Sequence, residues 1–83
     1  MDEATEDAAI QQAILQLLGE RRGSICPSEA ARLVDPVGWR QRMDAVRATA
    51  ARMAAEGTIR WTQRGEPQSP DAVRGPVRFE RAP

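Results

Sequence analysis

Apolar residues recur along the chain with two different periods, a helical period before Gly57 and an alternating period after it. In the segment from about Thr5 to Arg22 they recur at intervals of three and four, as on one face of a helix: Ile10, Ala13, Ile14, Leu17 and Leu18. We therefore predict an amphipathic first helix, which Gly23 ends as a C-terminal stop.

Two further helices are predicted to meet across a tight turn at Asp35-Pro36. Residues 24–26 are long enough only for a three-residue strand, and Pro27 suits the first turn of the helix that follows. Because the residue before a proline avoids the α region, this helix ends at Asp35 and Pro36 starts the next one. That third helix spans residues 36–56, and its inward stripe consists of Trp39, Met43, Val46, Ala50 and Met53.

Beyond Gly57 two segments alternate between apolar and polar residues, one with Ile59 and Trp61 and the other with Val77 and Phe79. They predict a two-stranded hairpin joined by a long loop over residues 64–76, with the strand at 24–26 completing the sheet. The fold class expected is α+β: a winged helix-turn-helix of three helices with a small three-stranded antiparallel sheet.

The length of 83 residues suits one domain. We divide the chain into an acidic N-terminal leader over residues 1–7, open to fraying, a single winged-helix domain over residues 8–80, and a C-terminal tail over residues 81–83. The acidic start and the lack of an apolar run of about 20 residues argue against a signal peptide and a membrane span, so the expected location is the cytoplasm.

The composition removes most catalytic side chains. The chain contains no His, no Lys and no Tyr, and its 12 basic residues are all arginine. Serine and cysteine nucleophiles that need a histidine base, Schiff-base chemistry and imidazole metal ligands are therefore excluded, and one cysteine cannot form an internal disulfide. We expect no enzyme activity, no cofactor, no metal and no small-molecule substrate.

Charge is distributed unevenly although the net charge is zero. Residues 1–7 carry four acidic residues and no basic residue, whereas residues 21–83 carry all 12 arginines against seven acidic residues, a net charge of +5. A basic body suits a polyanion as partner, and the open alternative is an ordinary surface of mixed charge.

The third helix is the first candidate for nucleic-acid binding. In a helix-turn-helix the second helix of the unit enters the major groove, where arginine can donate two hydrogen bonds to guanine. Arg40, Asp44 and Arg47 share one flank of residues 36–56, so we predict Arg40 and Arg47 as contacts. The alternative is that the three residues form ion pairs with one another on a solvated face.

The predicted wing is the second candidate. Arg60 and Arg64 flank its first strand, and Arg74 and Arg78 flank its second, so the loop could lie along a phosphate backbone or enter the minor groove. The alternative is cross-strand pairing of Arg60 or Arg78 with Glu80. The function expected is binding of double-stranded DNA through residues 36–56 and the loop 64–76. A protein-protein interaction module that binds another protein and no nucleic acid stays open.

Trp39, Trp61 and Cys26 each have two interpretations. The tryptophans could stack on unpaired bases, but both lie on apolar stripes and favour core packing. Cys26 precedes a predicted helix, where a thiol could be reactive, but a small buried inert residue is the more common case.

Several short motifs resemble a known family. They are Ile25-Cys26-Pro27-Ser28-Glu29-Ala30-Ala31-Arg32, Trp39-Arg40, Glu56-Gly57-Thr58-Ile59, Thr62-Gln63-Arg64-Gly65 and Arg74-Gly75-Pro76-Val77-Arg78. In this order, over about residues 8–80, they are similar to the small bacterial domain family of unknown function DUF3253. The resemblance implies a winged-helix fold and a bacterial source, and it brings no catalytic residue with it.

Overall fold

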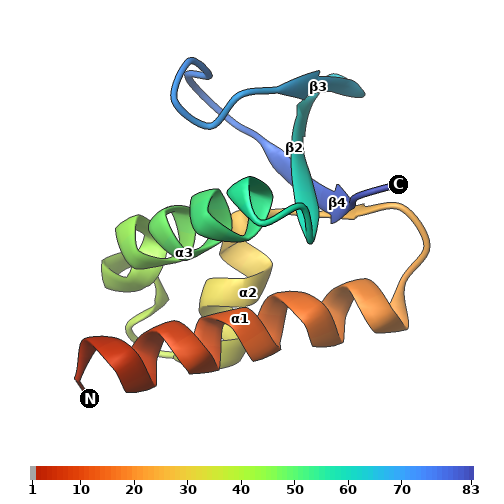
Figure 1. Cartoon of the computed structure of the whole chain (residues 1–83). Helices are drawn as coiled ribbons and strands as arrows, with labels where there is room; N and C mark the ends of the chain where they lie inside the picture. Colours follow the sequence, from red (N-terminus) through yellow and green to blue (C-terminus); the bar gives the residue numbers. More distant parts are fainter. Residues whose placement is uncertain (1) are drawn as a thin grey trace.

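Three α-helices, one 3₁₀ helix and a four-stranded antiparallel sheet form residues 2–83, the part of the chain that this computed structural model describes (Figure 1). The helices are α1 (Glu3–Glu20), α2 (Pro27–Val34) and α3 (Met43–Ala55), and the 3₁₀ helix η1 (Trp39–Arg42) precedes α3. The strands are β1 (Ser24–Ile25), β2 (Ile59–Gln63), β3 (Glu66–Gln68) and β4 (Arg78–Arg81). The fold class is α+β, as predicted.

The acidic segment that we expected ahead of the domain belongs to α1. Asp2 caps the helix, because its Oδ1 accepts a hydrogen bond of 2.8 Å from the backbone N–H of Thr5. Asp7 accepts a hydrogen bond of 2.6 Å from Arg52 of α3. Negative charge is favourable at a helix N-terminus, so residues 2–7 are capped and paired where we predicted a leader. Met1, the first residue of that leader, lies outside the described residues.

The long helix predicted over residues 36–56 is divided into a turn, η1 and α3. Asp35 ends α2, and its Oδ1 accepts a hydrogen bond of 2.8 Å from the backbone N–H of Gly38. The chain therefore turns at residues 36–38 and does not enter a helix at Pro36. Glycine is also a weak helix former, by about 1 kcal/mol relative to alanine. Consequently Arg40 lies in η1, whereas Arg47 lies in α3.

The sheet has the strand order β1-β4-β2-β3, which is one strand more than the three predicted. Trp61 of β2 lies opposite Phe79 of β4, with the ring centroids 5.3 Å apart. The extra strand β3 lacks apolar alternation and contains Pro67, so its sequence does not indicate a strand. Proline is tolerated there because β3 is at the edge of the sheet. β4 extends to Arg81, one residue into the predicted tail.

A two-residue turn joins β2 to β3. Arg64 and Gly65 have φ angles of 54° and 81°, and two positive φ angles are the signature of a type I′ hairpin turn. The loop predicted over residues 64–76 is thus a turn, the strand β3 and a return segment that reaches β4 at Arg78. The β2–β3 hairpin stands out from the helical part of the molecule (Figure 1).

The core lies between the helices and one face of the sheet. Its largest fully buried side chains come from every layer: Ile10, Ile14, Leu18, Ile25, Val46, Met53, Ile59 and Phe79. Trp61 is buried as expected, whereas Trp39 is only half-buried. Among residues 2–83, no helix has the length and apolar character needed to cross a lipid bilayer.

Candidate nucleic-acid interface

Carboxylates neutralise four of the twelve arginines, and three of these four lie outside the predicted interface. The pairs are Arg21 with Glu29, Arg42 with Glu6 and Asp35, Arg52 with Asp7 and Glu56, and Arg60 with Glu80. Within residues 2–83, the following arginines have no carboxylate within 4.0 Å: Arg22, Arg32, Arg40, Arg47, Arg64, Arg74, Arg78 and Arg81. Five of the six predicted contact residues therefore keep an uncompensated positive charge.

Arg42 forms ion pairs with two carboxylates at once. Arg42 donates to Glu6 at 2.7 Å and to Asp35 at 3.1 Å, and both carboxylates raise the pKa of its guanidinium. The backbone N–H of Gly38 and the Arg42 guanidinium lower the pKa of Asp35. These groups stay ionised near neutral pH, so the acidic residues of this corner are occupied by Arg42 and not by Arg40.

Arg40 lies over the ring of Trp39. Its Cζ is 4.4 Å from the ring centroid, and the Cζ of Arg32, at the end of α2, is 4.3 Å from the same centroid. Both distances are in the range of a cation–π interaction. The alternative in which Arg40 pairs with Asp44 along a helix is not what the described residues show, since no ion pair joins the two.

Arg47 lies over the second tryptophan. Its Cζ is 5.2 Å from the ring centroid of Trp61, so this side chain connects α3 to β2. Trp61 is 3% exposed, and its Nε1 has no hydrogen-bond partner within the described part of the chain. A guanidinium that stacks on an aromatic ring uses its flat face for this contact. The N–H groups at the edge of the guanidinium stay available to donate hydrogen bonds.

Arg60 is paired with its neighbour across the sheet. Arg60 and Glu80 are register partners on β2 and β4, and the Arg60 guanidinium donates to the Glu80 carboxylate. The cross-strand pairing that we considered as the alternative is therefore confirmed for Arg60.

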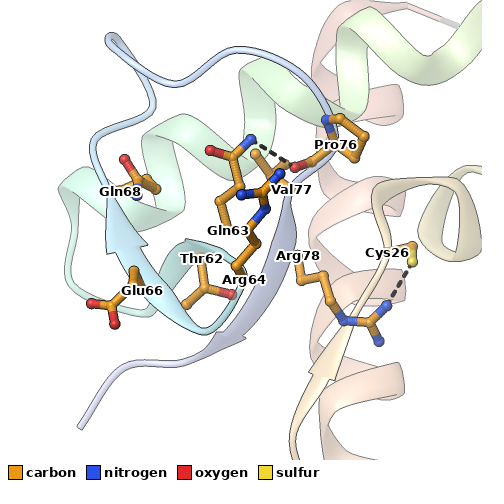
Figure 2. A pocket seen from close by; sticks show the side chains of 9 residues that line it. All are labelled: Cys26, Thr62, Gln63, Arg64, Glu66, Gln68, Pro76, Val77 and Arg78. Carbon is orange, nitrogen blue, oxygen red and sulfur yellow. Dashed lines mark hydrogen bonds between the residues drawn. The ribbon is translucent and has the colours of Figure 1, made fainter.

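Arg64 and Arg78 line one open hollow of about 720 Å³ beside the β2–β3 hairpin (Figure 2). Gln63 stands at its edge and donates from Nε2 to the backbone carbonyls of Arg74 and Pro76, at 2.7 Å and 3.1 Å, which ties the return segment to β2. The Glu66 carboxylate also lines the hollow, so the hollow is lined by charges of both signs. The side chain of Arg74 is exposed on the return segment.

Arg78 has a structural role in the sheet. Its guanidinium donates from Nη2 to the backbone carbonyl of Ser24 at 2.8 Å. It also donates from Nη1 to Cys26 Sγ at 2.9 Å (Figure 2). These bonds join β4 to the first residue of β1 and to the residue that follows β1. The half-buried Cys26 accepts one of them at the start of α2.

The family of the chain follows from its sequence over this whole fold. Residues 7–82 match the family described as "Protein of unknown function (DUF3253)". The chain belongs to the DUF3253 family. No curated protein matches the chain. The family description states no activity, so the chemistry of this DUF3253 protein has to be inferred from its own side chains.

Sequence reasoning missed Arg32 in this DUF3253 protein. A basic residue in the last turn of a helix is ordinarily explained by the helix dipole, and nothing in the spacing connects Arg32 to Trp39 across the turn. The structure brings Arg32 and Arg40 together on one ring and Arg64 and Arg78 around one hollow. Arg47 occupies a separate environment at Trp61.

Proposed function

We propose that this DUF3253 protein is a winged-helix domain that binds double-stranded DNA, with α3 as the helix that enters the major groove and the β2–β3 hairpin and return segment as the wing. Three helices followed by an antiparallel hairpin, with a short strand after the first helix, are the order that this architecture has. In it, α2 and the η1–α3 segment correspond to the two helices of a helix-turn-helix unit.

The proposal rests on the surroundings of the Arg40 and Arg47 side chains. Each guanidinium lies over a tryptophan ring, and neither has a carboxylate partner among the described residues. An arginine that only increases solubility gains little from being ordered by stacking. An arginine that contacts phosphate or guanine binds more tightly if it is already ordered, because it loses less conformational freedom on binding. We infer that Arg40 and Arg47 contact the DNA around the groove and that Arg64 and Arg74 lie along the phosphate backbone.

Salt dependence tests this function. Binding of the wild-type protein to a fluorescently labelled random duplex should weaken as salt rises, because neutralised phosphates release counterions. Arg40→Glu combined with Arg47→Glu should lower the duplex affinity at least about tenfold. The control is Arg22→Glu combined with Arg81→Glu, which makes the same change in net charge at two arginines outside the proposed interface. Because Arg81 donates to the backbone carbonyl of Leu18, circular dichroism verifies that this variant folds. No binding at low salt, or an equal loss in both variants, contradicts the proposal.

A second candidate, a protein-protein interaction module, is favoured by two exposed apolar side chains. Val37 is 95% exposed and Leu33 is 44% exposed, at the end of α2 and in the turn that follows. Surface apolar residues near tryptophan and arginine are typical of protein interfaces. This function predicts an oligomer or a complex that dissociates in a Val37→Asp variant, measured by sedimentation velocity. A protein that is monomeric at all concentrations and binds the duplex with salt dependence excludes it.

A further inference from the structure

Two like charges share one aromatic ring at the corner between α2 and η1. The guanidinium centres of Arg32 and Arg40 are 4.3 Å and 4.4 Å from the ring centroid of Trp39, so they are no further apart than the sum of these distances. Both arginines are exposed, whereas Trp39 is half-buried and packs against the core. The ring thus holds two exposed cationic side chains against the folded body of the protein.

No acidic group within residues 2–83 compensates this pair of charges. Asp35, the acidic residue nearest in sequence to the corner, accepts hydrogen bonds from Gly38 and Arg42. Asp44 forms no ion pair with either Arg32 or Arg40 in the described chain. Two positive charges held on one half-buried ring repel each other, and no carboxylate within 4.0 Å screens them in the described chain. An anion bound between or beside the guanidiniums would remove the repulsion.

We propose that Arg32, Trp39 and Arg40 form a phosphate clamp that binds the sugar–phosphate backbone of a nucleic acid. The two guanidiniums donate hydrogen bonds to phosphodiester oxygens, and Trp39 positions them without touching the ligand itself. This inference rests on the proposed function and deepens it, since it adds Arg32 and assigns Arg40 to the backbone and not to a base.

The place of the clamp in the fold favours phosphodiester over carboxylate. In a helix-turn-helix the first helix of the unit crosses the DNA backbone while the second lies in the groove. Arg32 is in the last turn of α2, the first helix of that unit, and Arg40 lies in η1, the 3₁₀ turn that leads into α3, the second. Guanidinium groups bind phosphate through planar, paired N–H groups, which suits a contact that sets orientation without reading sequence.

The test measures the salt dependence of duplex binding in single variants. Arg32→Gln and Arg40→Gln should each reduce the slope of log K against log salt by about 0.9, because each removes one phosphate contact. Arg22→Gln is the control, since Arg22 is also exposed and without a carboxylate partner in the described chain, but is far from Trp39 in sequence. Its slope should equal that of the wild type.

Two further variants separate charge from position. Arg32→Lys should keep the slope and lower the affinity about threefold, because lysine retains the charge but not the planar donor pair. Trp39→Leu keeps both charges, so it should lower the affinity at fixed salt by about threefold and leave the slope unchanged. Circular dichroism of each variant verifies the fold, and the two Arg32 variants decide the outcome if Trp39→Leu does not fold.

Three results overturn the clamp, and they are distinguishable. If the wild type binds the duplex with salt dependence but Arg32→Gln and Arg40→Gln behave like Arg22→Gln, the clamp is wrong and the proposed function stands. If the wild type does not bind the duplex at low salt, both are wrong. If poly-glutamate binds in an Arg32-dependent manner and the duplex does not, the site belongs to an acidic protein partner.

Discussion

At the scale of single residues, the neighbours of each arginine decide what it can do. Arg60 faces Glu80 across the sheet, so its charge is already neutralised within the protein. Arg64 lies in the tight turn of the same hairpin and has no carboxylate within 4.0 Å in the described residues. The two residues are four positions apart in sequence, and only the strand register separates a structural arginine from a candidate contact.

This difference predicts opposite effects of two equal substitutions. Arg64→Gln should reduce the salt slope of duplex binding by about 0.9 and leave the stability unchanged. Arg60→Gln should leave the slope unchanged and cost about 0.2 to 1 kcal/mol of stability, as for cross-strand ion pairs. Fluorescence anisotropy gives the slopes and urea unfolding gives the stabilities. Equal slopes in the two variants would show that pairing to Glu80 does not remove Arg60 from the interface.

At the scale of elements, the sequence predicted those parts that depend on local chemistry. Hydrophobic spacing located α1, and Pro27 and Asp35-Pro36 located α2. Gly57 is correctly predicted as the stop after α3, whereas α1 ends at Glu20, ahead of the predicted stop at Gly23. The turn at residues 36–38, where the third helix was expected to begin, depends on the hydrogen bond from Gly38 to the Asp35 side chain, which competes with helix formation and leaves no periodic signal. The strand β3 exists because β2 offers it an edge, which is a tertiary cause.

The candidate site was predictable to a smaller extent than the fold. Composition indicated arginine as the candidate contact side chain, but pairing depends on contacts between residues distant in sequence, such as Glu6 with Arg42, which are 36 positions apart. The stacking of Arg32 on Trp39 likewise requires the turn at residues 36–38, which we had predicted as helix. Spacing along a helix cannot show which arginines stay free.

Two glycines, one at the end of α3 and one within α1, should have opposite effects on stability when replaced by alanine. Gly57 has a φ of 81°, and the N–H groups of Gly57 and Thr58 donate to the carbonyls of Ala54 and Met53, which is a Schellman motif. Gly57→Ala should therefore destabilise the protein by about 1 kcal/mol. Gly19→Ala, within α1, should stabilise it by up to about 1 kcal/mol, because an added Cβ meets only Arg81 Nη2, at 4.0 Å. Urea unfolding measures both, and changes of the same sign would contradict this account.

At the scale of the whole molecule, acidic residues of α1 hold the helical layer together. Asp7 accepts hydrogen bonds from the Thr49 hydroxyl at 2.8 Å and from Arg52 at 2.6 Å, both on α3. Glu6 accepts a hydrogen bond from Arg42 in η1. These pairs place the charges of Glu6 and Asp7 on arginines that the proposed interface does not use. The same pairs therefore fasten α1 to α3 and leave the other arginines uncompensated.

This arrangement predicts a stability that falls in acid. The Thr49 hydroxyl and Arg52 lower the pKa of Asp7 below 3.8, its ordinary value, so the folded state binds the Asp7 proton less tightly than the unfolded state does. The stabilisation by Asp7 is thus complete above about pH 5 and is lost as the pH falls through the lowered pKa. Thermal melts followed by circular dichroism between pH 7 and pH 2 should show a constant melting temperature above about pH 5 and a fall below it.

Asp7→Asn should lower the melting temperature at pH 7 by a few degrees and reduce the further loss in acid, because the variant has no carboxylate left to protonate at this position. Asp71→Asn, at an exposed carboxylate without an ion pair in the described chain, is the control and should follow the wild type. If Asp7→Asn loses as much stability between pH 7 and pH 2 as the wild type does, another group is responsible for the acid sensitivity.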